Sequence, residues 1–129
     1  MITWNNLDTL EAFKNLSKAE RVNIAEAMSG ENGAERVKTY STPMAEGLAY
    51  NYAAKQVDDK LLEDLQKLAD EAQLTEKFEA LYNGEVINTG EKRMVLHHLT
   101  RGQLGEAVNA DGTDKRAFYK EQQQKIADF

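Results

Sequence analysis

Residues 83–101 read NGEVINTGEKRMVLHHLTR, and no other part of the chain carries as many groups suited to a functional site. The stretch opens on the turn residues Asn83 and Gly84, and a short extended piece follows. It holds two carboxylates, two adjacent histidines and two arginines. We expect a helix over about residues 91–101, stopped by Gly102.

The basic residues of this stretch are regularly spaced. Arg93, His97 and Arg101 stand four residues apart, so on a helix they would form one continuous stripe. Such a stripe suits recognition of an anion such as phosphate, because guanidinium groups match oxyanions in shape and charge. In the alternative, Glu85 and Glu91 pair with the stripe in a network that docks the helix on a neighbouring domain. We favour this structural network, because structural ion pairs also place charged groups together.

The residues alone indicate no catalytic or metal centre. His97 and His98 are adjacent, so their side chains diverge on a helix and on a strand, and one ion cannot easily take both. No glutamate follows at the HExxH spacing, and no third ligand lies close in the sequence. The glycines form neither GxGxxG nor a P-loop, and the chain has no cysteine. We therefore predict no metal, no cofactor and no catalytic group. The acidic residues expected on solvated helix faces are Glu11, Glu20, Glu63, Asp64, Asp70 and Glu71.

Upstream, apolar periodicity predicts helices with one change of period. A first helix is expected over residues 7–16, and Ser17 and Glu20 fit a capping box for a second over 19–28. Ser29-Gly30 and Asn32-Gly33 should break that helix. Over residues 35–52 we expect a two-stranded hairpin with Val37 and Tyr40 in its first, extended piece and Thr42-Pro43 at the turn.

Two further helices lead into the 83–101 stretch and one follows it. The apolar stripe over residues 57–72 predicts a helix capped by Asp58 or Asp59. Thr75 should cap the next helix, which ends at Asn83-Gly84. A loop is expected over residues 102–113, then an amphipathic helix. The residues expected on its buried side are Phe118, Gln122, Ile126 and Phe129. The predicted fold is mainly α with a short two-stranded β-hairpin.

Composition limits the class of protein. At 129 residues the chain is at most one domain. Its net charge of −6, from 16 basic and 22 acidic residues, argues against nucleic acid or an anionic membrane as a partner. No signal peptide is visible, and no apolar run approaches the roughly 20 residues that span a bilayer. We expect a cytoplasmic protein.

The apolar residue Phe129 at the end of the chain suggests that a larger fold continues there. The alternative is an ordinary docked C-terminal helix.

Residues 84–101 are similar to a segment of glucose-6-phosphate isomerases written GE-x-IN-x-TE-x-R-x-VLH-x-x-LR. The residues that match in register are Gly84, Glu85, Ile87, Asn88, Glu91, Arg93, Val95, Leu96, His97 and Arg101. ERVKTYS (35–41) resembles the R-x-x-x-x-S before the family's N-terminal hairpin, and LAYNYAAKQVDDKLLEDLQKLA (48–69) resembles its stretch through DYSKN and a leucine-rich helix. VNADGTD (108–114) resembles VDGxD, so the resemblance runs over residues 35–129.

The chain also departs from the family's pattern. Gly90 stands where the family has threonine, so a hydroxyl that could cap a helix is absent there. Asn51 replaces the aspartate of DYSKN, and Ala53-Ala54 replace its serine and lysine. These changes suggest a divergent branch of the family.

The resemblance implies the N-terminal helical segment of a larger α/β sugar-isomerase fold, a single domain or fragment over residues 1–129 that the catalytic domains would follow. The family's enzymes interconvert glucose 6-phosphate and fructose 6-phosphate through a cis-enediol, without a cofactor and as homodimers. Their catalytic glutamate, arginine, histidine and lysine lie in the sugar-isomerase domains. We therefore expect this chain alone to be inactive, with the remainder of the parent enzyme as its partner. The motif residues expected to be structural are Gly84, Glu85, Asn88, Glu91, Arg93, His97 and Arg101. The alternative is a stand-alone helical protein-interaction module without catalysis.

Overall fold

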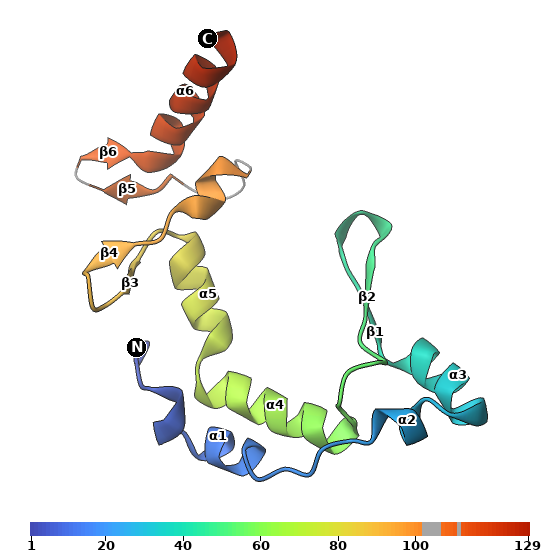
Figure 1. The fold of residues 1–129 in the computed structure, drawn as a ribbon. Coiled ribbons are helices and arrows are strands. Elements are labelled where there is room, and N and C mark those ends of the chain that lie inside the picture. The colour runs from blue at the N-terminus through green and yellow to red at the C-terminus, as the bar shows by residue number, and fades with distance from the viewer. Residues whose placement is uncertain (102–106, 111) are drawn as a thin grey trace. The chain divides into compact units, whose positions relative to one another are not determined.

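A computed structural model describes residues 1–101, 107–110 and 112–129 (Figure 1). Residues 6–71 form one compact unit, and residues 1–5 together with 72–129 form another. We call them the 6–71 unit and the 72–129 unit. The elements of the 6–71 unit are η1 (Leu7–Thr9), α1 (Glu11–Leu16), α2 (Ile24–Ala27), α3 (Gly30–Thr39), β1 (Ser41–Pro43), η2 (Ala45–Gly47), β2 (Ala49–Asn51) and α4 (Asp59–Glu71). Those of the 72–129 unit are α5 (Leu74–Tyr82), β3 (Val86–Asn88), β4 (Arg93–Met94), η3 (His97–Thr100), β5 (Asn109–Ala110), β6 (Thr113–Asp114) and α6 (Lys115–Asp128).

The prediction of a mainly helical fold with a hairpin is confirmed. The described residues hold three two-stranded antiparallel sheets, β1–β2, β3–β4 and β5–β6, where the sequence predicted one. Of the loop expected over 102–113, residues 102–106 and 111 lie outside the described residues, and the two strands of β5–β6 occupy part of the rest. No helix among the described residues is long and apolar enough to cross a membrane.

Helix α1 lies beside α4, and a carboxylate from α4 caps it. The Glu71 side chain accepts hydrogen bonds from the backbone N–H of Glu11 at 3.0 Å and of Ala12 at 2.7 Å. A carboxylate is favourable there because the first N–H groups of a helix have no partner within the helix. Glu71 therefore has a capping role that its prediction as a solvated helix face missed.

Of the helix predicted over residues 19–28, only α2 forms, and its start is not at the predicted capping box. The Ser17 hydroxyl donates to the Lys14 carbonyl at 2.8 Å, at the end of α1, and forms no capping box with Glu20. Helix α2 begins only after Asn23, whose side chain accepts from the N–H of Ala25 at 3.1 Å. An asparagine N-cap thus set the start of this short helix.

Helix α3 begins where the sequence predicted a break. It includes both Gly33 and Val37, so Val37 is helical rather than extended. Gly33 is buried, and a Cβ added there would overlap the backbone of Met28. The glycine therefore serves a close approach between two backbone segments rather than a helix break.

The β1–β2 hairpin follows α3 directly. Ser41 pairs with Asn51 and Pro43 with Ala49, so residues 42–43 lie in a strand and not at the turn. Residues 44–48 make the turn, closed by a 2.8 Å hydrogen bond from the Met44 N–H to the Leu48 carbonyl. The predicted hairpin is confirmed, with its turn further along the chain.

The helices α4 and α5 were predicted, and their starts differ in detail. Asp58 caps α4, because its side chain accepts from the Leu61 N–H at 2.8 Å. Gln73, with φ of 52°, precedes α5 in place of the expected Thr75. The Gln73 side chain accepts from the Thr3 N–H at 2.8 Å, which ties the first residues to the 72–129 unit.

The predicted final helix is α6, capped by Asp114, whose side chain accepts from the Arg116 N–H at 2.9 Å. The side chains expected to be buried are not: Phe118 is 45% and Ile126 76% exposed, and Phe129 is also exposed. The apolar side of α6 is therefore open among the described residues.

Candidate functional site

The 83–101 stretch does not form the helix predicted over residues 91–101. Its residues instead make a turn after α5, the β3–β4 hairpin and the short helix η3. Arg93 lies in β4 and His97 begins η3, while Arg101 follows it, so the three residues do not form one helical stripe. The physical reason is the turn after β3, where Lys92 has φ of 54°, which no α-helix accommodates.

Gly84 shapes the entry to this segment. Its φ is +76°, in the left-handed region that favours glycine, and it follows α5 directly. A Cβ added there would overlap the side chain of Val108, which is only 2% exposed. Gly84 is thus required both by backbone conformation and by the close approach of a core residue.

Asn88 and Glu91 hold the β3–β4 turn. The Asn88 Oδ1 accepts from the Glu91 N–H at 3.1 Å, and the Asn88 Nδ2 donates to Glu91 Oε2 at 3.2 Å. This reciprocal pair fixes the carboxylate of Glu91 to its own turn. It closes a turn in the backbone in the way asparagine side chains commonly do.

Asn88, Glu91, Arg93 and His97 line one cleft of about 320 Å³, which Tyr119 of α6 also lines. The sequence did not predict that Tyr119 would line this cleft, because only the packing of α6 brings its side chain there. The other motif residues, Gly84, Glu85 and Arg101, do not line this cleft.

The predicted network of ion pairs is not formed. Within residues 1–101, 107–110 and 112–129, no salt bridge joins Glu85 or Glu91 to Arg93, His97 or Arg101. Arg93 and His97 are exposed, and the side-chain N–H groups of each can donate a hydrogen bond to an oxygen atom. The same part of the chain holds no group of three or more His, Cys, Asp and Glu suited to a metal ion.

His98, in contrast to His97, is part of the packing. Its ring stacks on that of Tyr82, with centroids 4.9 Å apart, and its Nε2 lies 3.0 Å from the Tyr82 carbonyl. It precedes Leu99, which is fully buried, and Gln123 of α6 donates to the Thr100 carbonyl at 2.7 Å. The end of the motif is therefore anchored in the core of the 72–129 unit.

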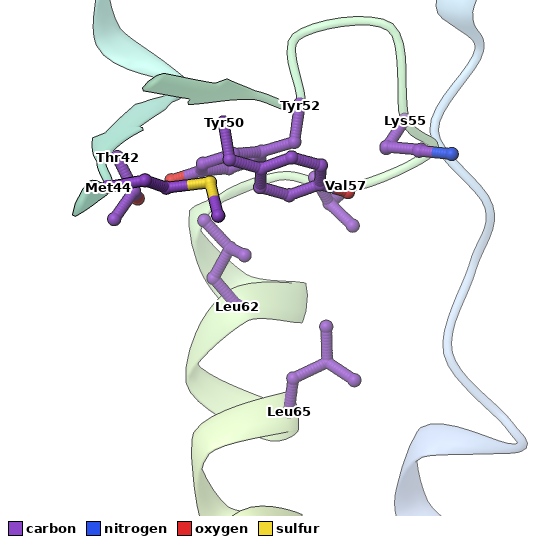
Figure 2. A pocket seen from close by; sticks show the side chains of 8 residues that line it. All are labelled: Thr42, Met44, Tyr50, Tyr52, Lys55, Val57, Leu62 and Leu65. Carbon is purple, nitrogen blue, oxygen red and sulfur yellow. The ribbon is translucent and has the colours of Figure 1, made fainter. Parts of the chain in front are cut away.

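A second feature is an apolar groove in the 6–71 unit, between the β1–β2 hairpin and α4 (Figure 2). It measures about 590 Å³. The residues that line it are Thr42, Met44, Tyr50, Tyr52, Lys55, Val57, Leu62 and Leu65. We call it the hairpin groove.

Arg36 fixes the segment that forms one end of the hairpin groove. Its buried guanidinium donates to the carbonyls of Ala53 at 2.7 Å, Lys55 at 3.0 Å and Val57 at 2.5 Å. It also lies over the Tyr40 ring, 4.2 Å from the centroid. Arg36 belongs to the matched ERVKTYS stretch, yet its role could not be read from the sequence, because its acceptors are main-chain carbonyls.

Two more side chains attach the hairpin to its surroundings. Tyr40 donates to Asp59 of α4 at 2.8 Å, and this hydrogen bond, with desolvation, raises the pKa of Tyr40 above its usual value. Asn51 donates to the Val37 carbonyl at 2.7 Å and accepts from the Ala53 N–H at 3.1 Å. An ionised aspartate has no donor for that carbonyl, so Asn51 fits this site better than the family's aspartate does.

Comparison with known proteins identifies the family. The family described as Phosphoglucose isomerase matches residues 51–129. A glucose-6-phosphate isomerase of Treponema denticola is 50% identical over 98% of this chain, and one of Treponema pallidum is 39% identical over 99%. A glucose-6-phosphate isomerase of Borreliella afzelii is 40% identical over 100% of the chain.

These alignments cover 25%, 25% and 24% of the three relatives, so the chain spans about a quarter of the length of the curated relatives it matches. They also include residues 1–34, so the resemblance recognised over residues 35–129 was too short. The chain belongs to the phosphoglucose isomerase family.

Proposed function

We propose that this chain is the N-terminal structural segment of a cytoplasmic, homodimeric glucose-6-phosphate isomerase. The full-length protein interconverts glucose 6-phosphate and fructose 6-phosphate, and its sugar-isomerase domains carry the catalytic groups. The observation that carries the proposal is the 50% identity to such an enzyme over nearly the whole chain, which spans a quarter of that enzyme.

The distribution of apolar side chains supports a structural role. Among the described residues the buried apolar side chains are few: Leu10, Ala12, Ala53, Ala80, Leu99 and Val108. Large apolar side chains are exposed in both units, with Leu48 65% and Phe78 64% exposed. Exposed apolar surface on this scale is typical of a surface that another part of a protein covers.

The geometry of the 83–101 stretch agrees with this role. Glu91 is held by Asn88 at a turn, and among the described residues no second carboxylate lines their cleft. A general base needs a carboxylate free to take a proton from bound substrate. We therefore propose that the motif residues position the β3–β4 hairpin against the sugar-isomerase domains.

The test of the proposal is a coupled assay on the full-length gene product. We expect it to form glucose 6-phosphate from fructose 6-phosphate at an enzymatic rate without added cofactor. A folded full-length protein without this turnover contradicts the assignment.

A variant at Arg93 separates the structural role from anion recognition. In the full-length protein, which by comparison with its relatives is about four times as long as this chain, Arg93→Ala should lower the melting temperature by about 1 °C, the shift that about 1 kcal/mol gives at that length. The KM for fructose 6-phosphate should stay within about twofold, because a structural residue does not contact the bound substrate and its removal takes away no substrate-binding energy. Lys92→Ala is the matched control, since Lys92 is adjacent and does not line the cleft. A large rise in KM at unchanged melting temperature would support anion recognition instead.

A further inference from the structure

The hairpin groove is apolar on both sides. Figure 2 shows Met44 and the rings of Tyr50 and Tyr52 on the hairpin side, with Leu62 and Leu65 of α4 facing them. The two tyrosine rings are stacked, with centroids 5.9 Å apart. The groove thus offers a flat aromatic wall opposite an aliphatic one.

The groove is open in this chain. Met44 is 57%, Tyr50 51% and Leu65 39% exposed, and Leu48 at the hairpin turn is 65% exposed. A two-stranded hairpin alone is marginally stable in water, and β1 and β2 have three residues each. A segment that covers the groove would therefore stabilise the hairpin further.

The groove is also preformed. Arg36 holds residues 53–57, Tyr40 bonds to Asp59 of α4, and Asn51 bonds to the end of α3. These contacts lie beside the groove and do not fill it. A preformed site loses little conformational freedom when a segment binds.

The charge of the residues that line the groove limits which kind of segment can bind there. Lys55 is the only charged residue that lines the groove, and its ammonium has no ion pair within the described part of the chain. Figure 2 shows the Lys55 nitrogen at one end of the groove and pointing away from its walls, so an apolar segment with a carboxylate just beyond that end would match both the walls and this cation. A strongly charged or nucleic-acid partner would not.

We infer that the hairpin groove binds an apolar segment of the same polypeptide that lies outside residues 1–129. A carboxylate of this segment forms an ion pair with the Lys55 ammonium. This inference rests on the proposed function, because the isomerase relatives extend well beyond the quarter of their length matched here. A tethered segment acts at an effective concentration of about millimolar, so it can cover a marginal hairpin before subunits meet.

A second copy of the chain fits the groove less well. Stable interfaces between proteins bury roughly 1,200–2,000 Å² in total, which requires a surface much wider than one groove. An intramolecular segment needs no such area, because it does not lose the freedom of a separate molecule.

Cysteine labelling of the full-length isomerase tests this inference, since residues 1–129 contain no cysteine. Met44→Cys places a thiol in the groove, and Lys38→Cys, on α3, places one at a side chain that is 76% exposed. Labelling of the unsubstituted protein gives the background, and labelling in urea gives the unprotected rate. We expect native Met44→Cys to react at least tenfold more slowly than native Lys38→Cys, at every protein concentration.

Equal rates for the two thiols would overturn the inference, and protection that disappears on dilution would assign the groove to a second copy. Thr42→Cys, which also lines the groove, repeats the test if Met44→Cys lacks isomerase activity and so is not native. Lys55→Glu should lower the melting temperature more than Lys38→Glu, and an equal effect counts against the carboxylate. Isomerase activity of the unsubstituted protein is measured in parallel, so failure of the proposed function is seen separately.

Discussion

Replacing Gly84 by alanine is expected to destabilise the 72–129 unit by about 2–5 kcal/mol. An L-residue in the left-handed region costs roughly 1–2 kcal/mol, and Gly84 has φ of +76°. Forcing a methyl group against the buried Val108 side chain adds about 1–3 kcal/mol. The measurement is urea denaturation of residues 1–129, followed by the fluorescence of Trp4. Trp4 is the only tryptophan of these residues and belongs to the 72–129 unit.

Gly112→Ala is the matched control for the backbone cost. Gly112 has φ of +70° in the same unit, and no described atom lies within 4 Å of the added Cβ. We expect Gly112→Ala to lower the free energy of unfolding only by the cost of the left-handed backbone conformation, roughly 1–2 kcal/mol. The double variant Gly84→Ala/Val108→Ala should be less destabilised than the sum of its single variants, because the overlap is removed. Additive effects, or equal effects at the two glycines, contradict the packing argument.

Replacing Arg36 by alanine should destabilise the 6–71 unit by about 3–5 kcal/mol, because three carbonyls lose a charged donor and a hydrogen bond to a charged group contributes about 1.5–3 kcal/mol, part of which water restores. The guanidinium holds three carbonyls of the segment between β2 and α4, and no other side chain of the described residues donates to them. Hydrogen exchange of residues 49–57 and the urea midpoint both report the loss. Arg36→Lys keeps the charge but not the fork of donors, so its effect should be intermediate.

Lys38→Ala is the control on the same helix. Its ammonium lies 3.8 Å from the Glu35 carboxylate and is exposed, so its removal should leave the urea midpoint unchanged. If Arg36→Ala leaves the urea midpoint unchanged, as Lys38→Ala is expected to, the guanidinium does not hold the segment at the end of the hairpin groove.

The sequence predicted elements whose own residues carry the signal. The leucine stripe of α4, the end of α5 at Asn83-Gly84 and the length of α6 all follow from local periodicity and turn residues. The 91–101 helix was wrong because Arg93, His97 and Arg101 have a spacing that a helix permits but does not require. Two apolar pairs, Val86-Ile87 and Met94-Val95, flank a glycine-containing turn, and this pattern was the overlooked hairpin signal.

The packed features could not be predicted from the sequence. Arg36 bonds to carbonyls that any residue could supply, and Glu71 caps a helix 59 and 60 positions away. Tyr119 reaches the cleft of Asn88 and Arg93 only through the placement of α6. The family resemblance placed the motif correctly in an isomerase family, but it did not indicate the conformation of that motif.

The central claim is that these residues belong to an isomerase without carrying its catalytic groups. The most direct test is the coupled assay with purified residues 1–129 alone, at high protein concentration, against buffer. We predict formation of glucose 6-phosphate from fructose 6-phosphate at the buffer rate, because in the described part of the chain the cleft at Asn88, Arg93 and His97 holds no carboxylate besides Glu91, which Asn88 binds. Turnover above buffer that rises in proportion to the concentration of residues 1–129 would contradict the claim.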